Sequence, residues 1–408
     1  MSKPNALFIA PVLPAPDGAG LRMRAHHTLS ALASEYAVHL LVVHQRFAER
    51  AKASGLSSLC RDHATMPIRY LAEPWVLLRQ AMRVYLPRLH YRSFSKPAEW
   101  IYLTEGRLGT LSKVFRGVDF ELVHVHRLYT FPVHEHFPYG TQPRRVQLDL
   151  DDIESRARRS IGRLYGLNGD KKTVKALARE AELYEPIERE ALASADRVFT
   201  CSTLDRDFLR REYPGANVEV VPNVVSIPTE TNPPAGKGPF VFLFVGALGY
   251  YPNHDAVRHF CRDILPEIRR LADRDFTIRI VGRGPAASLR RQIASASNVD
   301  FVGEAPDLAP HYAAADAVVA PIRAGGGTRI KILEAFAHRR PVVASEFGAE
   351  GLMAEHGTQV LLASSAAEFA RHCVRLMVDD ELRQSLAERA LGLVREAYTI
   401  EAMKRALL

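Results

Sequence analysis

The sequence predicts an α/β protein in which each half of the chain forms a Rossmann-like domain with a doubly wound parallel sheet. Short apolar runs alternate with amphipathic segments in both halves, as expected for buried parallel strands covered by helices on both faces. The alternation stops at 227–239, where prolines and glycines gather without apolar periodicity. We therefore expect an N-terminal domain at 1–226, a linker at 227–239 and a C-terminal domain at 240–398, with the two domains facing a central cleft.

In the first half, short apolar runs predict strands, and apolar residues that recur every three or four positions predict helices. The expected strands span 6–12, 37–43, 122–125, 145–148, 197–201 and 218–221. The expected helices span 21–34 and 171–194. A last helix at 399–408 follows the second domain, and we expect it to pack back onto the first.

After the linker the same rhythm restarts with near-continuous apolar strands. The expected strands span 240–245, 277–281, 299–302, 317–320 and 341–344. The expected helices span 254–271, 286–295, 308–314, 330–337, 366–378 and 381–397. The second half therefore predicts a second doubly wound sheet.

The composition excludes several classes of protein. Of the 408 residues 47% are hydrophobic, yet no apolar run approaches the ~18 residues that a membrane helix needs. The apolar run at 6–13 contains a proline and lacks a cleavage pattern, so it predicts a first strand in a cytoplasmic protein. The cysteines are far apart, which predicts buried thiols and neither disulfides nor a zinc site. They are Cys60, Cys201, Cys261 and Cys373.

The formal net charge of +8 suits an anionic ligand, and we expect no nucleic-acid partner. Segment 69–96 carries six basic residues and one acidic residue, interleaved with aromatic and leucine side chains. It predicts either peripheral contact with an anionic membrane at its inner face or a solvated pair of helices that covers the domain. The sequence leaves both interpretations open.

Ligands of open parallel sheets bind beyond the carboxyl ends of the strands, so the glycine-rich turns there are the candidate site. The strongest candidate is the turn before the helix expected at 330–337, in which backbone amides can approach an anion closely. Its members are Gly325, Gly326, Gly327 and Thr328. Arg329 and Lys331 follow at the helix start, where cations oppose the helix dipole unless an anion compensates them. Glu334 lies a turn further on, where a carboxylate can accept hydrogen bonds from a ribose diol. The alternative interpretations are a flexible surface loop for the glycine-rich turn and a solvent-exposed carboxylate for Glu334.

Two further turns of the second half have similar chemistry. Gly246 follows the first strand, and Asn253 is expected to cap the helix that begins at 254. Gly282 follows the next strand, and Arg283 adds one cation to that turn. This pair is not a dinucleotide fingerprint, because the remaining spacing and the acidic residue are missing.

We expect residues of the first domain to face these turns across the cleft. Gly18 and Gly20 precede a helix and leave room for a phosphate or a sugar. His126 lies at the exit of the strand at 122–125, where it is either functional or a structural histidine. Asp151 and Asp152 lie just beyond the end of a predicted strand. They predict contacts to acceptor hydroxyls or a helix cap, and a metal site is the weakest of the three interpretations. We expect no metal.

Together these residues resemble glycosyltransferase family 4, and in particular its bacterial polysaccharide sugar transferases. The resemblance extends over 240 to about 398. It rests on Phe244-Val245-Gly246 followed by Pro252-Asn253, Ile280-Val281-Gly282, Val302-Gly303, the turn and helix from Gly325 to Glu334, Arg340-Pro341-Val342-Val343-Ala344-Ser345 and Gly348-Ala349-Glu350-Gly351-Leu352. In the first domain it is thinner, with Gly18 to Gly20, Ala195-Asp196-Arg197-Val198, Cys201-Ser202 and Val221-Pro222-Asn223.

The sequence departs from this family at two places. Most members carry two glutamates in the segment that ends at Glu334, but Gly326 occupies the first position here. The usual Arg and Lys after the first strand of this domain are also missing. We infer that Arg329 and Lys331 replace that pair and that glycine amides replace the first glutamate, which leaves the donor sugar unspecified.

The resemblance implies a GT-B fold and a retaining, metal-independent glycosyltransferase without a cofactor. Its donor would be a UDP- or GDP-type nucleotide sugar, and its acceptor a sugar, a lipid-linked glycan or another hydroxyl compound, in polysaccharide or glycoconjugate biosynthesis. His126 would lie near the reacting sugar, as the resemblance implies. Two alternatives stay open, a non-catalytic subunit that binds nucleotide sugars and a nucleotide-sugar epimerase of the same fold.

Overall fold

The computed structural model describes residues 3–43, 56–66, 78, 82, 108–229 and 238–408. The interpretations of segment 69–96 and of most of the linker at 227–239 therefore lie outside the described residues. The chain forms two compact units, which we call unit 1 (1–224 and 400–408) and unit 2 (225–399). Each is described below by itself.

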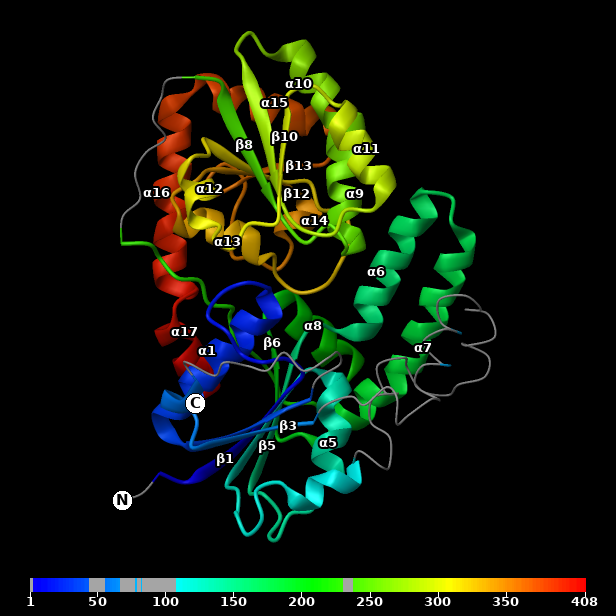
Figure 1. Ribbon diagram of the computed structural model, residues 1–408, viewed down its shortest axis with the longest axis vertical. Helices are drawn as coiled ribbons and strands as arrows, with labels where there is room; N and C mark the ends of the chain where they lie inside the picture. The colour runs from blue at the N-terminus through cyan, green and yellow to red at the C-terminus, as the bar shows by residue number, and fades with distance from the viewer. Residues whose placement is uncertain (1–2, 44–55, 67–77, 79–81, 83–107, 230–237) are drawn as a thin grey trace. The chain divides into compact units, whose positions relative to one another are not determined.

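The described part of unit 1 contains a seven-stranded parallel sheet in the order β3-β2-β1-β4-β5-β6-β7 (Figure 1). Its strands are β1 (Asn5–Ala10), β2 (Ala37–Val42), β3 (Asp62–Thr65), β4 (Leu122–His126), β5 (Arg145–Asp151), β6 (Arg197–Thr200) and β7 (Val218–Val220). Its helices are α1 (Gly20–Glu35), α5 (Phe131–Glu135), α6 (Glu154–Leu167), α7 (Lys171–Ser194), α8 (Thr203–Glu212) and α17 (Ile400–Leu407). The strand order reverses between β1 and β4.

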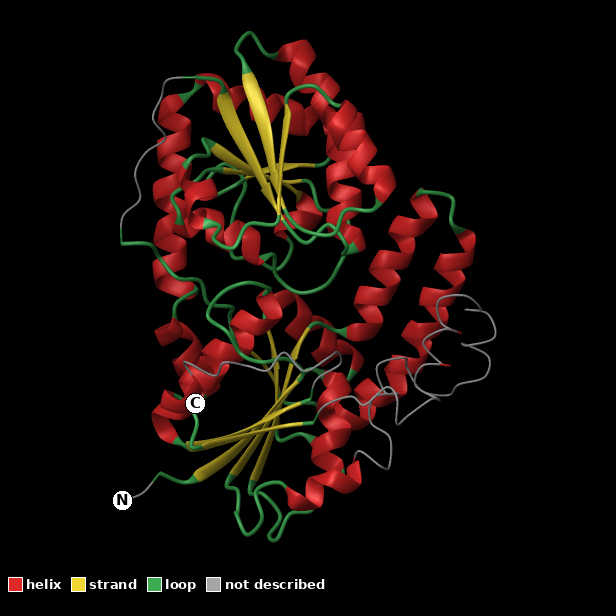
Figure 2. Ribbon diagram, viewed as in Figure 1, coloured by secondary structure: helices red, strands yellow, loops and turns green. Residues whose placement is uncertain are grey.

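The described part of unit 2 contains a six-stranded parallel sheet in the order β10-β9-β8-β11-β12-β13, with helices on both faces (Figure 2). Its strands are β8 (Phe240–Val245), β9 (Phe276–Val281), β10 (Val299–Gly303), β11 (Ala317–Ala320), β12 (Val342–Ser345) and β13 (Leu361–Ala363). Its helices are α9 (Tyr251–His259), α10 (Leu265–Leu271), α11 (Ala287–Ser295), α12 (Ala309–Ala313), α13 (Ile330–Ala337), α14 (Glu346–Ala349), α15 (Ala366–Val378) and α16 (Asp380–Ala397). The predicted α/β class with two parallel sheets is confirmed.

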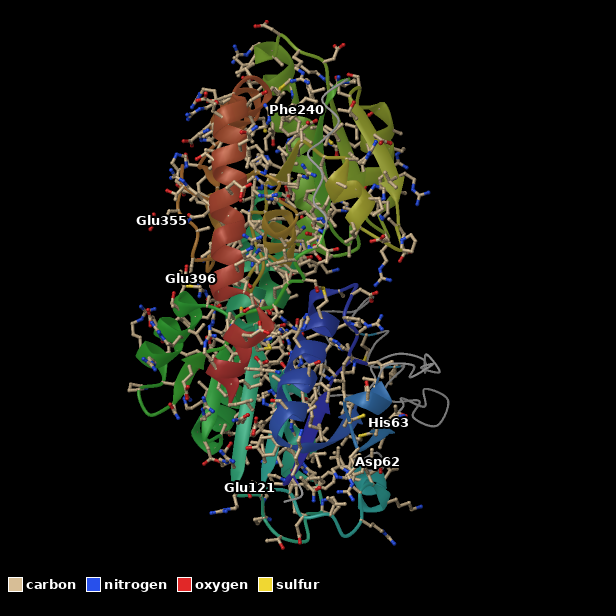
Figure 3. All side chains as sticks on the ribbon, turned by 90° about the vertical axis from the view of Figure 1, so that its left-hand side faces the viewer. Asp62, His63, Glu121, Phe240, Glu355 and Glu396 are labelled. Atoms are coloured by element: carbon tan, nitrogen blue, oxygen red, sulfur yellow. The ribbon has the colours of Figure 1, made fainter. Side chains whose placement is uncertain are left out.

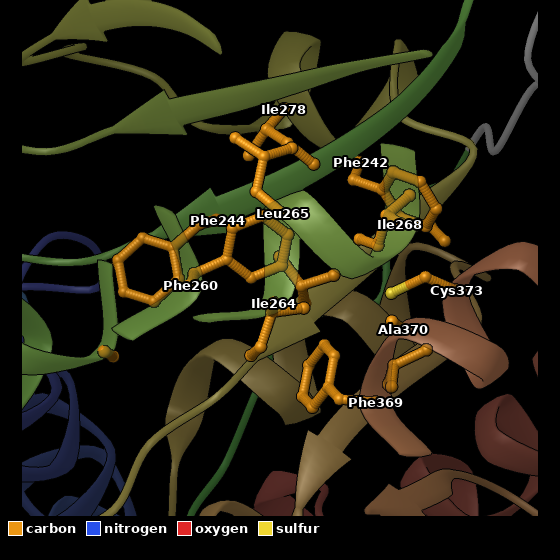
Figure 4. Close-up of a cluster of buried hydrophobic side chains, with 14 of the residues drawn as sticks. Phe242, Phe244, Phe260, Ile264, Leu265, Ile268, Ile278, Phe369, Ala370 and Cys373 are labelled. Carbon is orange, nitrogen blue, oxygen red and sulfur yellow. The ribbon is translucent and has the colours of Figure 1, made fainter. Parts of the chain in front are cut away.

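Alternate residues of β8 supply the cores on the two faces of the sheet in unit 2. Phe242 and Phe244 point to one face, where they meet α10 and α15 residues such as Leu265 and Phe369 (Figure 4). Leu243 and the other intervening residues belong to the second core, which contains α13 and α16. Because both faces are buried, the strand reads as a continuous apolar run, which is why the sequence predicts it well.

Helix α17 packs against α1 within unit 1. Met403 and Leu407 are fully buried in a core that also contains Leu29 and Leu32 of α1. Arg197 of β6 donates hydrogen bonds of 2.9 and 3.1 Å to the last carbonyl oxygens of the helix. A cation at this end also suits the helix dipole, so α17 is held by apolar packing and by its C-terminal carbonyls.

Several elements differ from the expectations. The helix expected at 254–271 begins earlier, at Tyr251, and contains a π-helical turn at Phe260–Ile264 before α10. Edge strand β3 is polar and mostly exposed, and the labelled Asp62 and His63 mark it in Figure 3. Helix α6 and the three-residue strand β13 have no counterpart among the expected elements, because the first is rich in arginine and the second is too short to show a period.

Candidate functional site

The glycine-rich turns of unit 2 meet at the point where the strand order of its sheet reverses. From β8 the chain continues to β9 on one side of the sheet, and from β11 it continues to β12 on the other side. Such a switch point is the usual ligand site of doubly wound sheets. The turn that begins at Gly246 follows β8, and the loop at 321–329 follows β11 and leads into α13. The predicted anion-binding residues therefore come together at one end of one sheet.

The turns after β8 and β9 touch through their backbones. A Cβ atom added to Gly282 would lie 1.9 Å from the carbonyl oxygen of Gly246, which leaves no room for any side chain. Leu248 donates a backbone hydrogen bond of 2.8 Å to the carbonyl of Arg283 and so ties the two turns together. The predicted glycines Gly246 and Gly282 thus fix the position of the β8 turn.

Replacement of Gly282 by alanine should lower the free energy of unfolding of unit 2 by about 1–3 kcal/mol, because the added methyl group forces the two turns apart. Chemical denaturation followed by circular dichroism would measure the loss. Gly392→Ala is the matched control, since its Cβ would meet nothing within 4 Å in α16 and alanine favours a helix. Equal stability of both variants would contradict this steric account.

The loop before α13 is shaped by Arg329. Its guanidinium donates a hydrogen bond of 2.7 Å to the carbonyl of Gly326 and a second one to the carbonyl of Gly327. The same group lies 5.1 Å from the centre of the Phe347 ring. Gly325 and Gly327 have φ values of 127° and 60°, which favour glycine. Arg329 therefore ties down two carbonyls of its own loop.

No side chain among the described residues caps the N-terminus of α13. No capping side chain therefore competes with a ligand for the amides at this helix start, where the positive end of the helix dipole also lies, although the Ile332 amide already donates a 2.9 Å hydrogen bond to the Arg329 carbonyl. Lys331 lies in this first turn, and its ammonium donates a hydrogen bond of 2.7 Å to Asn253 Oδ1. Burial, and then the nearby Arg329, lower the pKa of Lys331 to about 7, although Glu334 opposes the shift.

Glu334 lies one turn beyond Lys331 on α13. Its Oε2 atom accepts a hydrogen bond of 2.8 Å from the hydroxyl of Tyr312, a residue of α12. Burial raises the pKa of Glu334, while Tyr312 and Lys331 oppose the shift. This carboxylate is thus oriented by Tyr312, and its remaining oxygen can accept a hydrogen bond from a ligand hydroxyl.

A buried ion pair anchors the loop after β11 to α9. Arg323 donates hydrogen bonds of 2.9 and 3.0 Å to the two oxygens of Asp255, whose side chain is fully buried. Arg258 approaches the same carboxylate at 2.8 Å. In contrast, the predicted ligand residue Arg283 is exposed and pairs only loosely with Glu304, at 3.4 Å.

Three of the predicted residues of unit 1 lie at the switch point of its own sheet, between β1 and β4. Gly18 has a φ of 92°, and Gly20 is the first residue of α1, whose N-terminus has no side-chain cap among the described residues. His126 ends β4 and is fully buried, with its ring stacked 6.4 Å from that of Phe8. Burial lowers the pKa of His126 to about 3, so its imidazole is neutral at pH 7. Any role it has in a reaction is therefore that of a hydrogen-bonding group and not of a cation.

Asp151 and Asp152 belong to a network of charges after β5. Arg127 Nη1 lies 3.3 Å from Asp151 and 3.2 Å from Asp152, and its Nη2 lies 2.5 Å from Glu154. Burial and then Asp152 raise the pKa of Asp151 to about 7, although Arg127 and Arg24 oppose the shift. The carboxylates outnumber the guanidiniums, and they can accept hydrogen bonds from hydroxyl groups.

Three further residues of unit 2 hold the predicted site residues through contacts that the sequence does not reveal. Asn253 does not cap a helix beginning at 254, because α9 begins at Tyr251 and Asn253 lies inside its first turn, where it binds Lys331. Tyr312 holds Glu334 of α13, and Asp255 holds Arg323 of the loop. Their partners are 22 and 68 residues away, so no local pattern reveals them.

Within the described residues there is no group of three or more His, Cys, Asp or Glu side chains placed to hold a metal ion. Nor does this part of the chain contain a helix long and apolar enough to cross a bilayer. The four cysteines are all buried free thiols, as predicted.

The chain is similar to known glycosyltransferases in sequence and in structure. Residues 239–379 match the family described as Glycosyl transferases group 1. Over 187 residues the chain is 30% identical to a phosphatidyl-myo-inositol mannosyltransferase of Mycobacterium leprae (strain TN), a match that covers 44% of this chain and 50% of that protein. The chain thus spans about half the length of this curated relative.

Two solved structures resemble the chain over nearly its whole length. Anabaena Alr3699/HepE, in complex with UDP and glucose, has a TM-score of 0.62 at 16% identity and covers 98% of this chain and 97% of its own. A trehalose-6-phosphate synthase, studied for glycosyl transfer with retention, has a TM-score of 0.66 at 14% identity with the same coverages of 98% and 97%. At such identities these likenesses show the fold, which is GT-B. Residues 239–379 are thus similar to the glycosyl transferases group 1 family, and the chain as a whole has a GT-B fold.

Proposed function

We propose that this chain is a retaining glycosyltransferase that moves a sugar from a UDP- or GDP-type nucleotide sugar to an acceptor hydroxyl without a metal ion. The observation that carries the proposal is the arrangement at the switch point of unit 2. There an uncapped helix start, a triple-glycine loop and the Lys331 ammonium converge on one place. This combination binds a diphosphate, because amide dipoles and a fixed cation stabilise its charge.

The same groups account for catalysis. When the glycosidic bond breaks, negative charge grows on the leaving diphosphate, and donors that are already in place stabilise that charge most effectively. Lys331 and the amides at the start of α13 would serve this role, while Arg329 fixes the loop and Glu334 accepts a hydrogen bond from the ribose. The UDP and glucose complex of Alr3699/HepE and the retention studied in the trehalose-6-phosphate synthase support this assignment.

We assign the acceptor to unit 1. Gly18 leaves space beside Gly20 at the start of α1, and Asp151 and Asp152 offer oxygens that accept hydrogen bonds from hydroxyls. His126 would contribute as a neutral imidazole. The phosphatidyl-myo-inositol mannosyltransferase supports a lipid-linked acceptor, and with it a place at the inner face of a membrane and in glycoconjugate synthesis.

The test uses purified protein and a panel of UDP-, GDP-, ADP- and TDP-sugars. One nucleotide class should raise the melting temperature, because a ligand at 100 times its Kd stabilises the native state by about 2.7 kcal/mol. With the selected donor and EDTA present, nucleoside diphosphate should be released and the product should keep the donor's anomeric configuration by NMR. Binding without any release would favour the non-catalytic subunit, and conversion of the donor alone would favour an epimerase. Stabilisation by none of the sugars would refute donor binding.

A further inference from the structure

Asn253 bridges two elements of unit 2 that are far apart in the sequence. Its Nδ2 atom donates a hydrogen bond of 3.0 Å to the carbonyl of Ala247, in the turn after β8. Its Oδ1 atom accepts a hydrogen bond of 2.7 Å from Lys331 Nζ, on α13. Only this orientation of the amide satisfies both partners, since Ala247 offers an acceptor and Lys331 a donor. The bridge therefore fixes where the Lys331 ammonium lies.

That place is the exit of strand β8. A Cβ atom added to Gly246 would lie 2.8 Å from Lys331 Nζ and 2.9 Å from the Asn253 carboxamide. The ammonium also lies 4.5 Å from the centre of the Phe244 ring, which adds a cation–π contact. Gly246 is thus needed so that a cation from α13 can reach the turn after β8. That turn has no lysine or arginine of its own between 246 and 253.

The charge of Lys331 is not balanced by an ion pair. Among the described residues no carboxylate lies within 4.0 Å of its ammonium, and the partners that hold it are a neutral amide oxygen and an aromatic ring. The charged groups that face it are Arg329, which disfavours its protonation, and Glu334, which favours it but is bound by Tyr312. An arriving anion would therefore find a cation that is positioned but not neutralised.

We propose that Asn253 is a positioning residue that holds the Lys331 ammonium at the β8 turn, and that binding of a nucleotide sugar there takes up a proton onto Lys331. The inference rests on the proposed function, because it assigns this cation to the donor diphosphate. The amide holds the lysine without pairing its charge, whereas a carboxylate at the same position would neutralise it.

The sign of the pH dependence follows from the free and bound states. Without ligand the pKa of Lys331 is about 7, so at pH 8 most molecules carry a neutral amine. A bound diphosphate favours the ammonium and raises this pKa, so binding at pH 8 takes up a proton. Affinity should therefore fall as the pH rises above 7 and stay constant below about pH 6.

Calorimetric titration with UDP-glucose and with GDP-mannose, in buffers of different ionisation enthalpy, measures affinity and proton uptake together. The diphosphate diesters of these donors do not titrate near neutral pH, so any uptake belongs to the protein. Asn253→Ala should weaken binding on the order of 10-fold, as expected for one lost hydrogen bond to a charged group. Asn253→Asp should raise the Lys331 pKa and shift proton uptake to higher pH. Lys331→Arg should abolish the uptake, because arginine does not titrate in this range.

Asn168→Ala is the matched control, since that carboxamide also donates to a backbone carbonyl, at 3.0 Å, but in unit 1. It should leave both affinity and proton uptake unchanged. Circular dichroism melting curves check that each variant is folded. If the wild-type protein binds neither donor, the proposed function fails. If it binds one, but Asn253→Ala and Asn253→Asp match the wild type in affinity and uptake, the role of Asn253 is wrong while the function stands.

Discussion

Replacing Lys331 with alanine should lower the turnover of the nucleotide sugar by about 10²–10³-fold, the usual cost of removing one preorganised donor from a developing negative charge. The reason is geometric, because Lys331 is the cation that Asn253 holds at the exit of β8. Release of nucleoside diphosphate under saturating donor would measure kcat. Arg290→Ala, which removes an exposed arginine of α11 in the same unit, should retain wild-type activity.

The same turnover assay also tests Arg329. Arg329→Ala should also lower turnover strongly, since it frees the carbonyls of Gly326 and Gly327 to turn toward the ligand. Arg329→Lys keeps the charge but not the planar fork, so it should recover little activity if shaping the loop is the main role. Because both residues serve one site, the loss in Arg329→Ala/Lys331→Ala should be smaller than the product of the single losses. Normal transfer by that double variant would contradict the assignment of the diphosphate site.

Arg24→Met should lower the free energy of unfolding of unit 1 by about 3–5 kcal/mol, the cost of breaking a buried ion pair from one side. Arg24 donates two hydrogen bonds of 2.8 Å to the oxygens of Asp149, and both side chains are 1% exposed. It also donates to Val221 O at 3.1 Å and to Asn223 Oδ1 at 3.0 Å. Its loss would leave the Asp149 carboxylate buried without a counter-charge.

Hydrogen exchange resolved by peptide would measure this loss in unit 1 separately from unit 2. Arg24→Met/Asp149→Leu should recover much of the stability, since removing both charges leaves an apolar contact. Arg179→Ala breaks an exposed pair with Glu182, whose side chains are 52% and 53% exposed, and should change stability by less than about 0.5 kcal/mol. Equal effects of Arg24→Met and Arg179→Ala would show that burial of the Arg24 pair contributes nothing.

The fold was predictable where a single local period dominates. The buried strand β8 appears in the sequence as an unbroken apolar run, and α7 matches the expected helix at both ends. Helix α6 was missed because it buries alanine, serine and glycine beneath a row of arginines, so its apolar period is weak. The π-helical turn at Phe260–Ile264 was missed because an apolar helix pattern does not distinguish hydrogen-bond spacing.

The residue types of the candidate site could be predicted from the sequence, but the contacts between their side chains could not. The glycines and cations of 325–331 point to an anion by residue type alone, and the structure places them at a switch point. What the sequence could not show is that Arg329 turns back onto its own loop while Lys331 reaches across to Asn253. Both outcomes depend on contacts between side chains of different elements, and no spacing rule encodes a pair 78 residues apart.

The placement of α17 has a consequence for the order of synthesis. Residues 400–408 complete unit 1, yet the whole of unit 2 is translated between them and the rest of that unit. While a ribosome makes the intervening 225–399 segment, Leu29 and Leu32 of α1 lack the apolar cover that Met403 and Leu407 later provide. Unit 2 can therefore finish folding first although it is encoded second, because the apolar face of α1 is covered only once α17 has been made.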